Sequence, residues 1–382
     1  MRTSHRTIRK LIREEQSKIT DEQLFSSQQF SAYMTDIVET ATKRYRRRSK
    51  VKMHWDPFSN SDVAHTDNRL IHINAANFLT RSFPTRSLQA DSIIGLAGHE
   101  AGHILFTDFT MLQIHMQALE AGSFYPAEPG NLTMLQSLSL QQIKNYFEEK
   151  DEAVIQAIRL VTHSLVNTME DLYIEARMMD AFPGSFKTGI LLNNLRFSED
   201  IPSVTDEIAE GHHEVFIIIN LLIQYAKSGD LNNADGYKGK YLDTLYECIP
   251  FLDDAAYDED AKARYQAANQ MLVLLWPYMP SLIEQVREDL KNKTHHAAQA
   301  AEEQLATPPK TLSGTSKPVP SKTPYNHTPS SEDEERERLQ SALDYETGRI
   351  ALEKTDEISE GDSGGTSYDR NFSGSGYVSQ AA

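Results

Sequence analysis

The sequence predicts an α+β protein that is mostly α, with a small β-hairpin or sheet, a helical bundle and a disordered tail. Three observations predict this class. Apolar residues recur at helical spacing over most of the first 290 residues, and short alternating segments occupy residues 51–75. From residue 293, prolines and small polar residues replace the large apolar ones, and such a segment cannot bury enough surface to fold. We therefore expect an N-terminal helical segment (1–50), a folded domain (51–292), and a linker and tail (293–382) with a short helix.

Within the first 75 residues, the spacing of apolar residues changes from a helical pattern to the alternation typical of strands. Apolar residues follow helical spacing in "TIRKLIREEQ" and "AYMTDIVETATKRY". The segments "VKMHW" and "RLIHIN" then alternate, and "SNSDVAHTDN" between them is rich in turn-forming residues. We expect a β-hairpin or meander over about 51–75, whose last strand could bind an extended substrate by edge addition.

Helices are expected through the rest of the folded domain. One runs from about 91 to 106, with Asp91 as its N-cap. A long helical stretch covers roughly 139–180, is broken once near Asp151, and ends at Pro183 and Gly184. Further helices fit 205–227, 237–250 and 258–290, with a loop between the first two of these.

Charge and cysteine content limit the class of protein. A net charge of -17 argues against general nucleic-acid binding. The exception is Lys43–Lys50, "KRYRRRSK", which is either a solvated helix end or a docking patch for an acidic partner. Cys248 is the only cysteine and lies among apolar residues, so we expect a core thiol in a reducing compartment. With no secretory h-region and no apolar run of about 18 residues, we expect a soluble, cytoplasmic protein without membrane spans.

The segment "GHEAGHILFTDF" carries the strongest chemical signal. His99 and His103 are four residues apart, so a helix presents both imidazoles on one face to one metal ion. Glu100 can reach a metal-held water as a general base without being a ligand. Gly102 leaves room beside the site at a cost of about 1 kcal/mol to helix stability, which is mild evidence for function.

Zinc catalysis needs a third protein ligand and one open position. The motif does not supply that ligand, because Phe106 and Phe109 stand where an H-x-x-G-x-x-H continuation would place glycine and histidine. Asp108 could orient a ligand histidine through a hydrogen bond, or contact the last turn of the helix.

An acidic helix is the best source of the third ligand. Residues 167–178, "NTMEDLYIEARM", crowd Glu170, Asp171 and Glu175 beside an apolar stripe, and such carboxylates repel one another unless a cation lies nearby. Glu170 is the preferred ligand. Asp171 is a close alternative, and it shares a helix face with Glu175, so the two could divide ligand and orienting roles. The competing interpretation is a surface helix whose acids pair with Arg177.

"GHEAGHILFTDF" together with the downstream N-x-x-E-D-x-x-I-E pattern resembles a zincin-type metallopeptidase domain. The resemblance is to the cobaltochelatase-subunit-like proteins, many from phages and mobile elements, and covers about residues 51–290. It implies a zincin-like fold and a zinc ion held by His99, His103 and the acidic helix. It also implies Glu100 as the general base.

Two departures from that family affect the expected partners. Tyr173 stands where the family often has arginine, so the source of charge neutralisation is open. The family domain commonly precedes a von Willebrand A domain, but no D-x-S-x-S motif is present here. We therefore expect a shortened member, or a von Willebrand A-type partner on another polypeptide. The motif also occurs in membrane-tethered AAA+ proteases, whose nucleotide-binding loop is absent here.

These observations predict a zinc metallopeptidase that hydrolyses peptide bonds of a protein or peptide substrate. The possible donors to an oxyanion are Tyr173, His212 and His213, although a structural role is favoured for each. We expect His163 to pack between helices. One alternative is a non-catalytic, zinc-stabilised adaptor that binds a partner AAA+ ATPase or von Willebrand A-type subunit. A weaker alternative is hydrolysis of a non-peptide amide.

Overall fold

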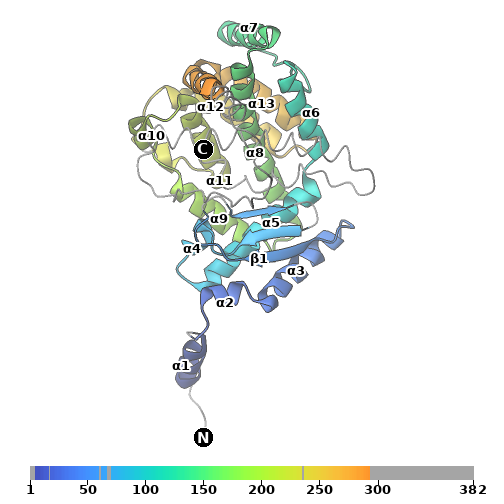
Figure 1. Cartoon of the computed structure of the whole chain (residues 1–382), viewed down its shortest axis with the longest axis vertical. Helices are drawn as coiled ribbons and strands as arrows, with labels where there is room; N and C mark the ends of the chain where they lie inside the picture. The colour runs from blue at the N-terminus through green and yellow to red at the C-terminus, as the bar shows by residue number, and fades with distance from the viewer. Residues whose placement is uncertain (1–4, 17, 60–61, 67–69, 235, 293–382) are drawn as a thin grey trace, which may run out of the picture. The chain divides into compact units, whose positions relative to one another are not determined.

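The computed structural model describes the chain except residues 1–4, 17, 60–61, 67–69, 235 and 293–382 (Figure 1). The described residues are mostly helical and include one small three-stranded sheet, which confirms the predicted α+β, mostly α class. The predicted tail at 293–382, with its short helix, lies outside the described residues.

The described residues form two compact units. Unit 1 comprises those within 1–107 and 174–197, and unit 2 comprises those within 108–173 and 198–292. Helix α8 (Glu152–Ala181) belongs to both, because it continues without a break past residue 173. Helix α3, from the expected N-terminal segment, lies in unit 1 together with the sheet.

Unit 1 contains the sheet and the helices that cover it. Its elements are α1 (His5–Gln16), α2 (Asp21–Phe25), α3 (Gln28–Lys43), β1 (Lys50–His54), β2 (Ala64–Thr66), β3 (Leu70–Asn74), α4 (Phe78–Arg81), α5 (Arg86–Phe106), the end of α8 and most of α9 (Lys187–Asp200). Helix α3 packs on β1, and α5 packs on β2, β3, α3 and α4. The buried side chains of Ile71 and Ile73 on β3 form part of the core between these elements.

The strand order corrects the predicted hairpin. The order is β1-β3-β2, with β3 parallel to β1 and antiparallel to β2. The turn-rich segment itself supplies β2, whose Ala64 pairs with Ile73, while Val51 of β1 pairs with Ile71. Because β3 is hydrogen-bonded along both edges, it cannot bind a substrate by edge addition as expected.

Helix α5 begins earlier than predicted. Thr85 is its N-cap and accepts a hydrogen bond from the backbone N–H of Leu88, so Asp91 lies inside the helix and is not its cap. Close packing accounts for a glycine on this helix. A Cβ at Gly102 would lie 3.1 Å from Met178 Cγ and 3.2 Å from Ile174 Cβ. Contact with α8 therefore explains Gly102, and this glycine is no longer evidence for function.

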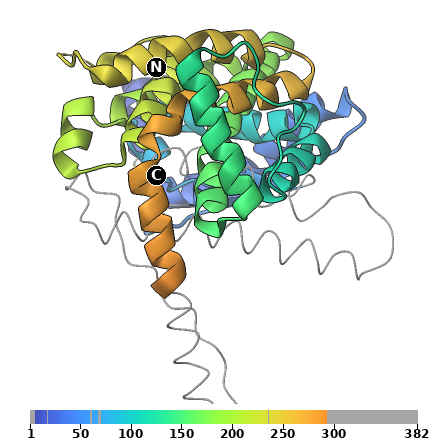
Figure 2. The same ribbon diagram turned by 90° about the horizontal axis from the view of Figure 1, so that it is seen from above.

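Unit 2 is helical. It contains α6 (Phe109–Glu120), α7 (Met134–Glu149), the first part of α8, α10 (Val204–Glu210), α11 (Glu214–Ser228), α12 (Lys240–Ala256), α13 (Ala261–Leu275) and a last helical stretch at 280–292. The break predicted near Asp151 is confirmed: α7 ends at Glu149, its C-cap Lys150 has a left-handed conformation, and Asp151 Oδ1 accepts from Val154 N. The last stretch, orange in Figure 2, is tied to this point by a 3.0 Å contact between Arg287 and Asp151 Oδ2.

Two further expectations concern the cysteine and membrane-spanning helices. Cys248 is fully buried, which confirms a core position, and burial raises the pKa of its thiol. Among the described residues, no helix combines the length and apolarity needed to cross a bilayer.

Candidate metal centre

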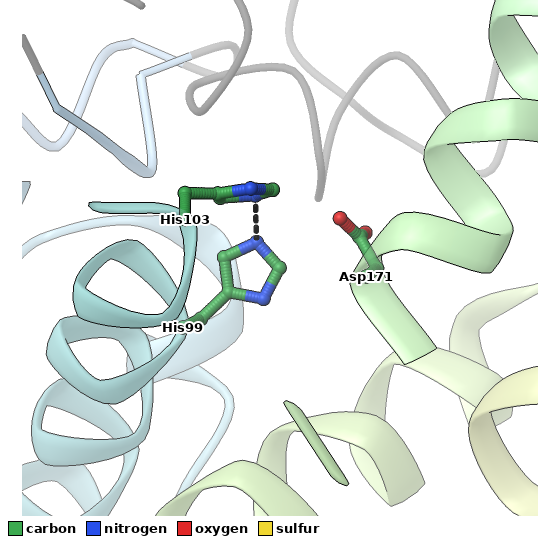
Figure 3. A group of neighbouring side chains, drawn as sticks. All are labelled: His99, His103 and Asp171. Atoms are coloured by element: carbon green, nitrogen blue, oxygen red, sulfur yellow. Dashed lines mark hydrogen bonds between the residues drawn. The ribbon is translucent and has the colours of Figure 1, made fainter. Parts of the chain in front are cut away.

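Helix α5 places two imidazoles side by side. His99 and His103 lie one turn apart, both are completely buried, and their Nε2 atoms are 3.2 Å apart. Figure 3 shows the two rings on the same side of the helix, with their facing nitrogens joined by the dashed line. Two nitrogen ligands at about 2.05 Å from a tetrahedral zinc ion lie about 3.3 Å apart, so this separation fits a shared metal ion.

The other ring nitrogen of each histidine is held by a neighbour within unit 1. His99 Nδ1 lies 2.9 Å from Glu175 Oε1, and His103 Nδ1 lies 3.0 Å from Thr107 Oγ1. Asn194 Nδ2 donates to Glu175 Oε2 at 2.6 Å, which fixes the carboxylate in turn. With Nδ1–H of His99 donating to the carboxylate, Nε2 carries the lone pair that a metal ion needs. This arrangement is the usual support for a metal-binding histidine.

Asp171 completes the group. It lies on α8 one turn before Glu175, so one continuous helix carries both the orienting carboxylate and this acid. One ligand atom each from His99, His103 and Asp171 lie within 4.8 Å of one another, and all three residues are buried (Figure 3). Two imidazoles and one carboxylate are a common ligand set for zinc.

Glu170 does not occupy the predicted ligand position. Its Oε2 accepts a 2.7 Å hydrogen bond from Arg264 Nε, and both side chains are almost completely buried. Successive residues on a helix are rotated by about 100°, so Glu170 and Asp171 lie on different faces of α8. The geometry therefore favours Asp171, the predicted alternative, over Glu170 as the third ligand.

The cation that pairs with Glu170 comes from an unexpected place. The guanidinium of Arg264 lies 4.1 Å from the centre of the Tyr173 ring, and Arg264 is on α13, 94 residues after Glu170. The resemblance pointed to an arginine at position 173; here, a more distant residue supplies the charge. The predicted partner Arg177 lies over the ring of Phe106.

Asp108 has a capping role. Its Oδ1 accepts from Met111 N at 3.0 Å, which caps the start of α6. The role of orienting a ligand histidine, predicted for Asp108, is filled by the adjacent Thr107 at His103.

His212 and His213 have structural contacts, the role that the sequence favoured for each. His212 Nε2 lies 3.2 Å from Glu210 Oε2 and its Nδ1 lies 3.6 Å from Glu207 Oε1. His213 Nδ1 lies 3.0 Å from Ser281 Oγ. These contacts belong to unit 2, and among the described residues the only clustered metal-ligand group is that of His99, His103 and Asp171.

Three residues near this group were not predicted. Thr107 follows His103 by four residues, so its position could have been recognised at the helix end. Asn194 and Lys227 have no local signal, because tertiary packing alone brings them to Glu175 and Asp171. Lys227 Nζ lies 3.5 Å from Asp171 Oδ2, and its side chain is 2% exposed.

Glu100, the predicted general base, is completely buried directly after His99 on α5. No protein-family model matches the chain, and no curated protein or solved structure matches it significantly. The chemistry of the candidate centre therefore rests on its own residues.

Proposed function

We propose that the protein is a zinc-dependent metallopeptidase. The convergence of the His99 and His103 Nε2 atoms at 3.2 Å is the observation that carries this proposal, and their Nδ1 atoms are already engaged by Glu175 and Thr107. His99, His103 and Asp171 would hold the metal ion.

The residues present suit amide hydrolysis. When bound, zinc supplies Lewis-acid polarisation and lowers the pKa of a coordinated water towards about 7. Glu100 is the nearest acid in sequence to the two histidines and is not one of the three clustered ligands. Its carboxylate takes the proton from the attacking water and passes that proton to the leaving amine. We propose a cytoplasmic location, because the lone buried thiol of Cys248 suits a reducing compartment.

Metal analysis combined with peptide cleavage tests this function. We expect purified wild-type protein to contain stoichiometric zinc, and we expect His99→Ala to lose it. Glu100→Gln keeps the three ligands, so it should retain zinc while cleavage of a casein-derived peptide library falls by at least about 100-fold. His213→Ala, at a partly exposed histidine bonded to Ser281, serves as the matched control. Wild-type protein without zinc would remove the basis for the proposal.

Complete burial favours a second candidate function. His99, Glu100, His103 and Asp171 each have 0% exposure, whereas a catalytic zinc site needs a position open to water and substrate. A closed site of this kind suits a non-catalytic adaptor that zinc stabilises. Under this alternative, Glu100→Gln binds zinc and retains partner binding, and wild-type protein cleaves no peptide.

The basic segment is the surface that an adaptor would present. All six cations of Lys43–Lys50 are exposed, and none forms an ion pair within the part of the chain that the structure describes. Tyr45 anchors the segment by packing against Phe106 and Phe182. An acidic surface of an AAA+ ATPase or a von Willebrand A-type subunit is the partner that we propose for it.

A further inference from the structure

Each of the two adjacent acids on α8 is paired with a buried cation from another helix of unit 2. Glu170 pairs with Arg264 on α13, and Asp171 pairs with Lys227 on α11. Buried charges are costly unless they are compensated, and each of these cations compensates the charge of its acid. The two pairs differ in their nitrogen–oxygen distances, which are 2.7 Å for Arg264–Glu170 and 3.5 Å for Lys227–Asp171.

Arg264 is fixed by several contacts. Its Nε donates to Glu170 at 2.7 Å, another guanidinium nitrogen donates to Asp258 O at 2.8 Å, and its plane lies over Tyr173. A charge-assisted hydrogen bond of this length is strong. Glu170 Oε2 is therefore committed to Arg264, and Glu170 is not part of the cluster that His99, His103 and Asp171 form.

Lys227 lies at a longer distance from its acid. Its Nζ lies 3.5 Å from Asp171 Oδ2, at the outer limit of a hydrogen bond, and it ends a flexible four-carbon side chain. An ammonium group is a compact point charge, so it can compensate the carboxylate without fixing its orientation. Asp171 also clusters with His99 and His103, so the carboxylate that Lys227 compensates is the one that a metal ion would need.

We propose that Lys227 is a displaceable counter-ion of Asp171, which competes with the divalent cation for this carboxylate. The inference rests on the proposed metal site and adds a property to it: the metal-free protein stays folded because Lys227 supplies positive charge that zinc would otherwise supply. Zinc binding is then reversible and less tight than the three ligands alone would allow. Lys227 is thus a residue that sets metal affinity.

Lys227→Met tests this role. The variant removes the competing charge, so we expect zinc affinity, measured by competition with a chromogenic chelator, to rise by between about 5- and 150-fold, the usual range of coupling between two ligands. By linkage, the zinc-induced rise in melting temperature should also be larger than in the wild type, because the metal-free form is weakened while the zinc form is not. Lys238→Met, at an exposed lysine of the same unit, is the matched control.

Two further variants keep the result interpretable. Lys227→Arg retains the charge and should leave zinc affinity near the wild-type value. The double variant Lys227→Met/Asp171→Asn removes both charges, so in the presence of chelator it should recover part of the stability that Lys227→Met loses. This second measurement needs no metal and applies even if Lys227→Met alone is too unstable to load with zinc.

The outcomes separate this inference from the proposed function. If wild-type protein binds no zinc, the metal site itself fails. If wild-type protein binds zinc and Lys227→Met binds it with unchanged or lower affinity, the counter-ion role of Lys227 is overturned. Additive effects of the two substitutions in chelator would also overturn it, because a true pair is coupled.

Discussion

The orientation of two imidazoles depends on residues outside the group of three clustered ligands. Glu175 holds Nδ1 of His99, Asn194 holds Glu175, and Thr107 holds Nδ1 of His103. All of these contacts form within unit 1. They fix which nitrogen of each ring faces the other, so the candidate centre is organised before a metal ion arrives.

Substitutions on α8 and α9 should distinguish the residue that binds the metal ion from the residues that orient a ligand and from an acid with neither role. We expect Asp171→Asn to reduce zinc affinity most, because it removes a ligand charge. Glu175→Gln and Asn194→Ala should each reduce affinity by about 10- to 100-fold, the usual effect of losing an orienting partner. Glu170→Gln is the control, since Gln can still accept from Arg264 and residue 170 is not part of the clustered ligand group. Equilibrium competition with a chelator measures all four, and a larger loss in Glu170→Gln than in Asp171→Asn would return the ligand assignment to Glu170.

Single residues of this site differ in how far the sequence predicts them. The spacing of His99 and His103 predicted their shared face, and a chemical argument placed acids of α8 beside them. The choice between Glu170 and Asp171 depended on Arg264 and Lys227, which lie 94 and 56 residues away along the chain. No local pattern contains that information, because the packing of α11 and α13 decides which acid each cation meets.

At the scale of elements, α5 and α9 cross with their backbones in close approach. Gly95 and Gly189 meet at this crossing: a Cβ built on Gly95 would lie 2.3 Å from the carbonyl carbon of Gly189, and one on Gly189 would lie 2.2 Å from the backbone oxygen of Asp91. No side chain can relieve these overlaps, because the neighbouring atoms are backbone. The crossing brings α9, which carries Asn194, to the helix that carries His99.

Substitution at this crossing should destabilise unit 1. We expect Gly95→Ala to lower the free energy of unfolding by at least about 1–3 kcal/mol, the usual cost of overpacking, even though alanine favours the helix itself. Gly184→Ala is the matched control, since a Cβ there has no neighbour within 4 Å. Urea denaturation followed by far-UV circular dichroism measures both variants. Equal stability of Gly95→Ala and wild type would show that the two helices can move apart without cost.

The elements themselves were predictable where local signals agreed. Helical spacing on both sides of Asp151 predicted the change from α7 to α8. The beginning of α5 was missed because Thr85, rather than Asp91, caps it, and both residues suit that role by type. The strand order was missed because a turn-rich segment contains the three residues of β2, too few for an alternating pattern to show.

At the scale of the whole molecule, the periodicity of apolar residues predicted the fold class, whereas the sequence pattern did not predict the division into two units. The described residues of unit 1 come from two stretches of the sequence, 1–107 and 174–197, and residues 108–173 between them belong to unit 2. Helix α8 contributes residues to both units. No linker composition marks such a boundary, because the chain passes it inside a continuous helix. The stability of a folded unit also depends on pH. In unit 2, a buried histidine allows this dependence to be tested.

His115 is completely buried and holds a neutral ring. Its Nδ1 donates to Tyr125 O at 2.9 Å, its ring stacks on Tyr265, and its buried Nε2 has no hydrogen-bond partner among the described residues. Burial lowers the pKa of His115 from 6.5 to about 4, because a proton on Nε2 would be charged and unsolvated. The unfolded chain therefore binds this proton at a higher pH than the folded chain does.

His115 should consequently make unit 2 sensitive to acid. Its contribution to stability is fully present above pH 6.5 and is lost as the pH falls from there towards about 4. The loss is on the order of 3 kcal/mol at the acid end. We expect His115→Phe to flatten the dependence of unfolding free energy on pH in this window, measured by urea denaturation in chelator. Phe keeps the stacking, and Asn269 Nδ2 still donates to Tyr125 O at 3.0 Å, so the carbonyl stays satisfied. Parallel pH profiles for the variant and the wild type would show that His115 is already protonated, or hydrated, in the folded protein.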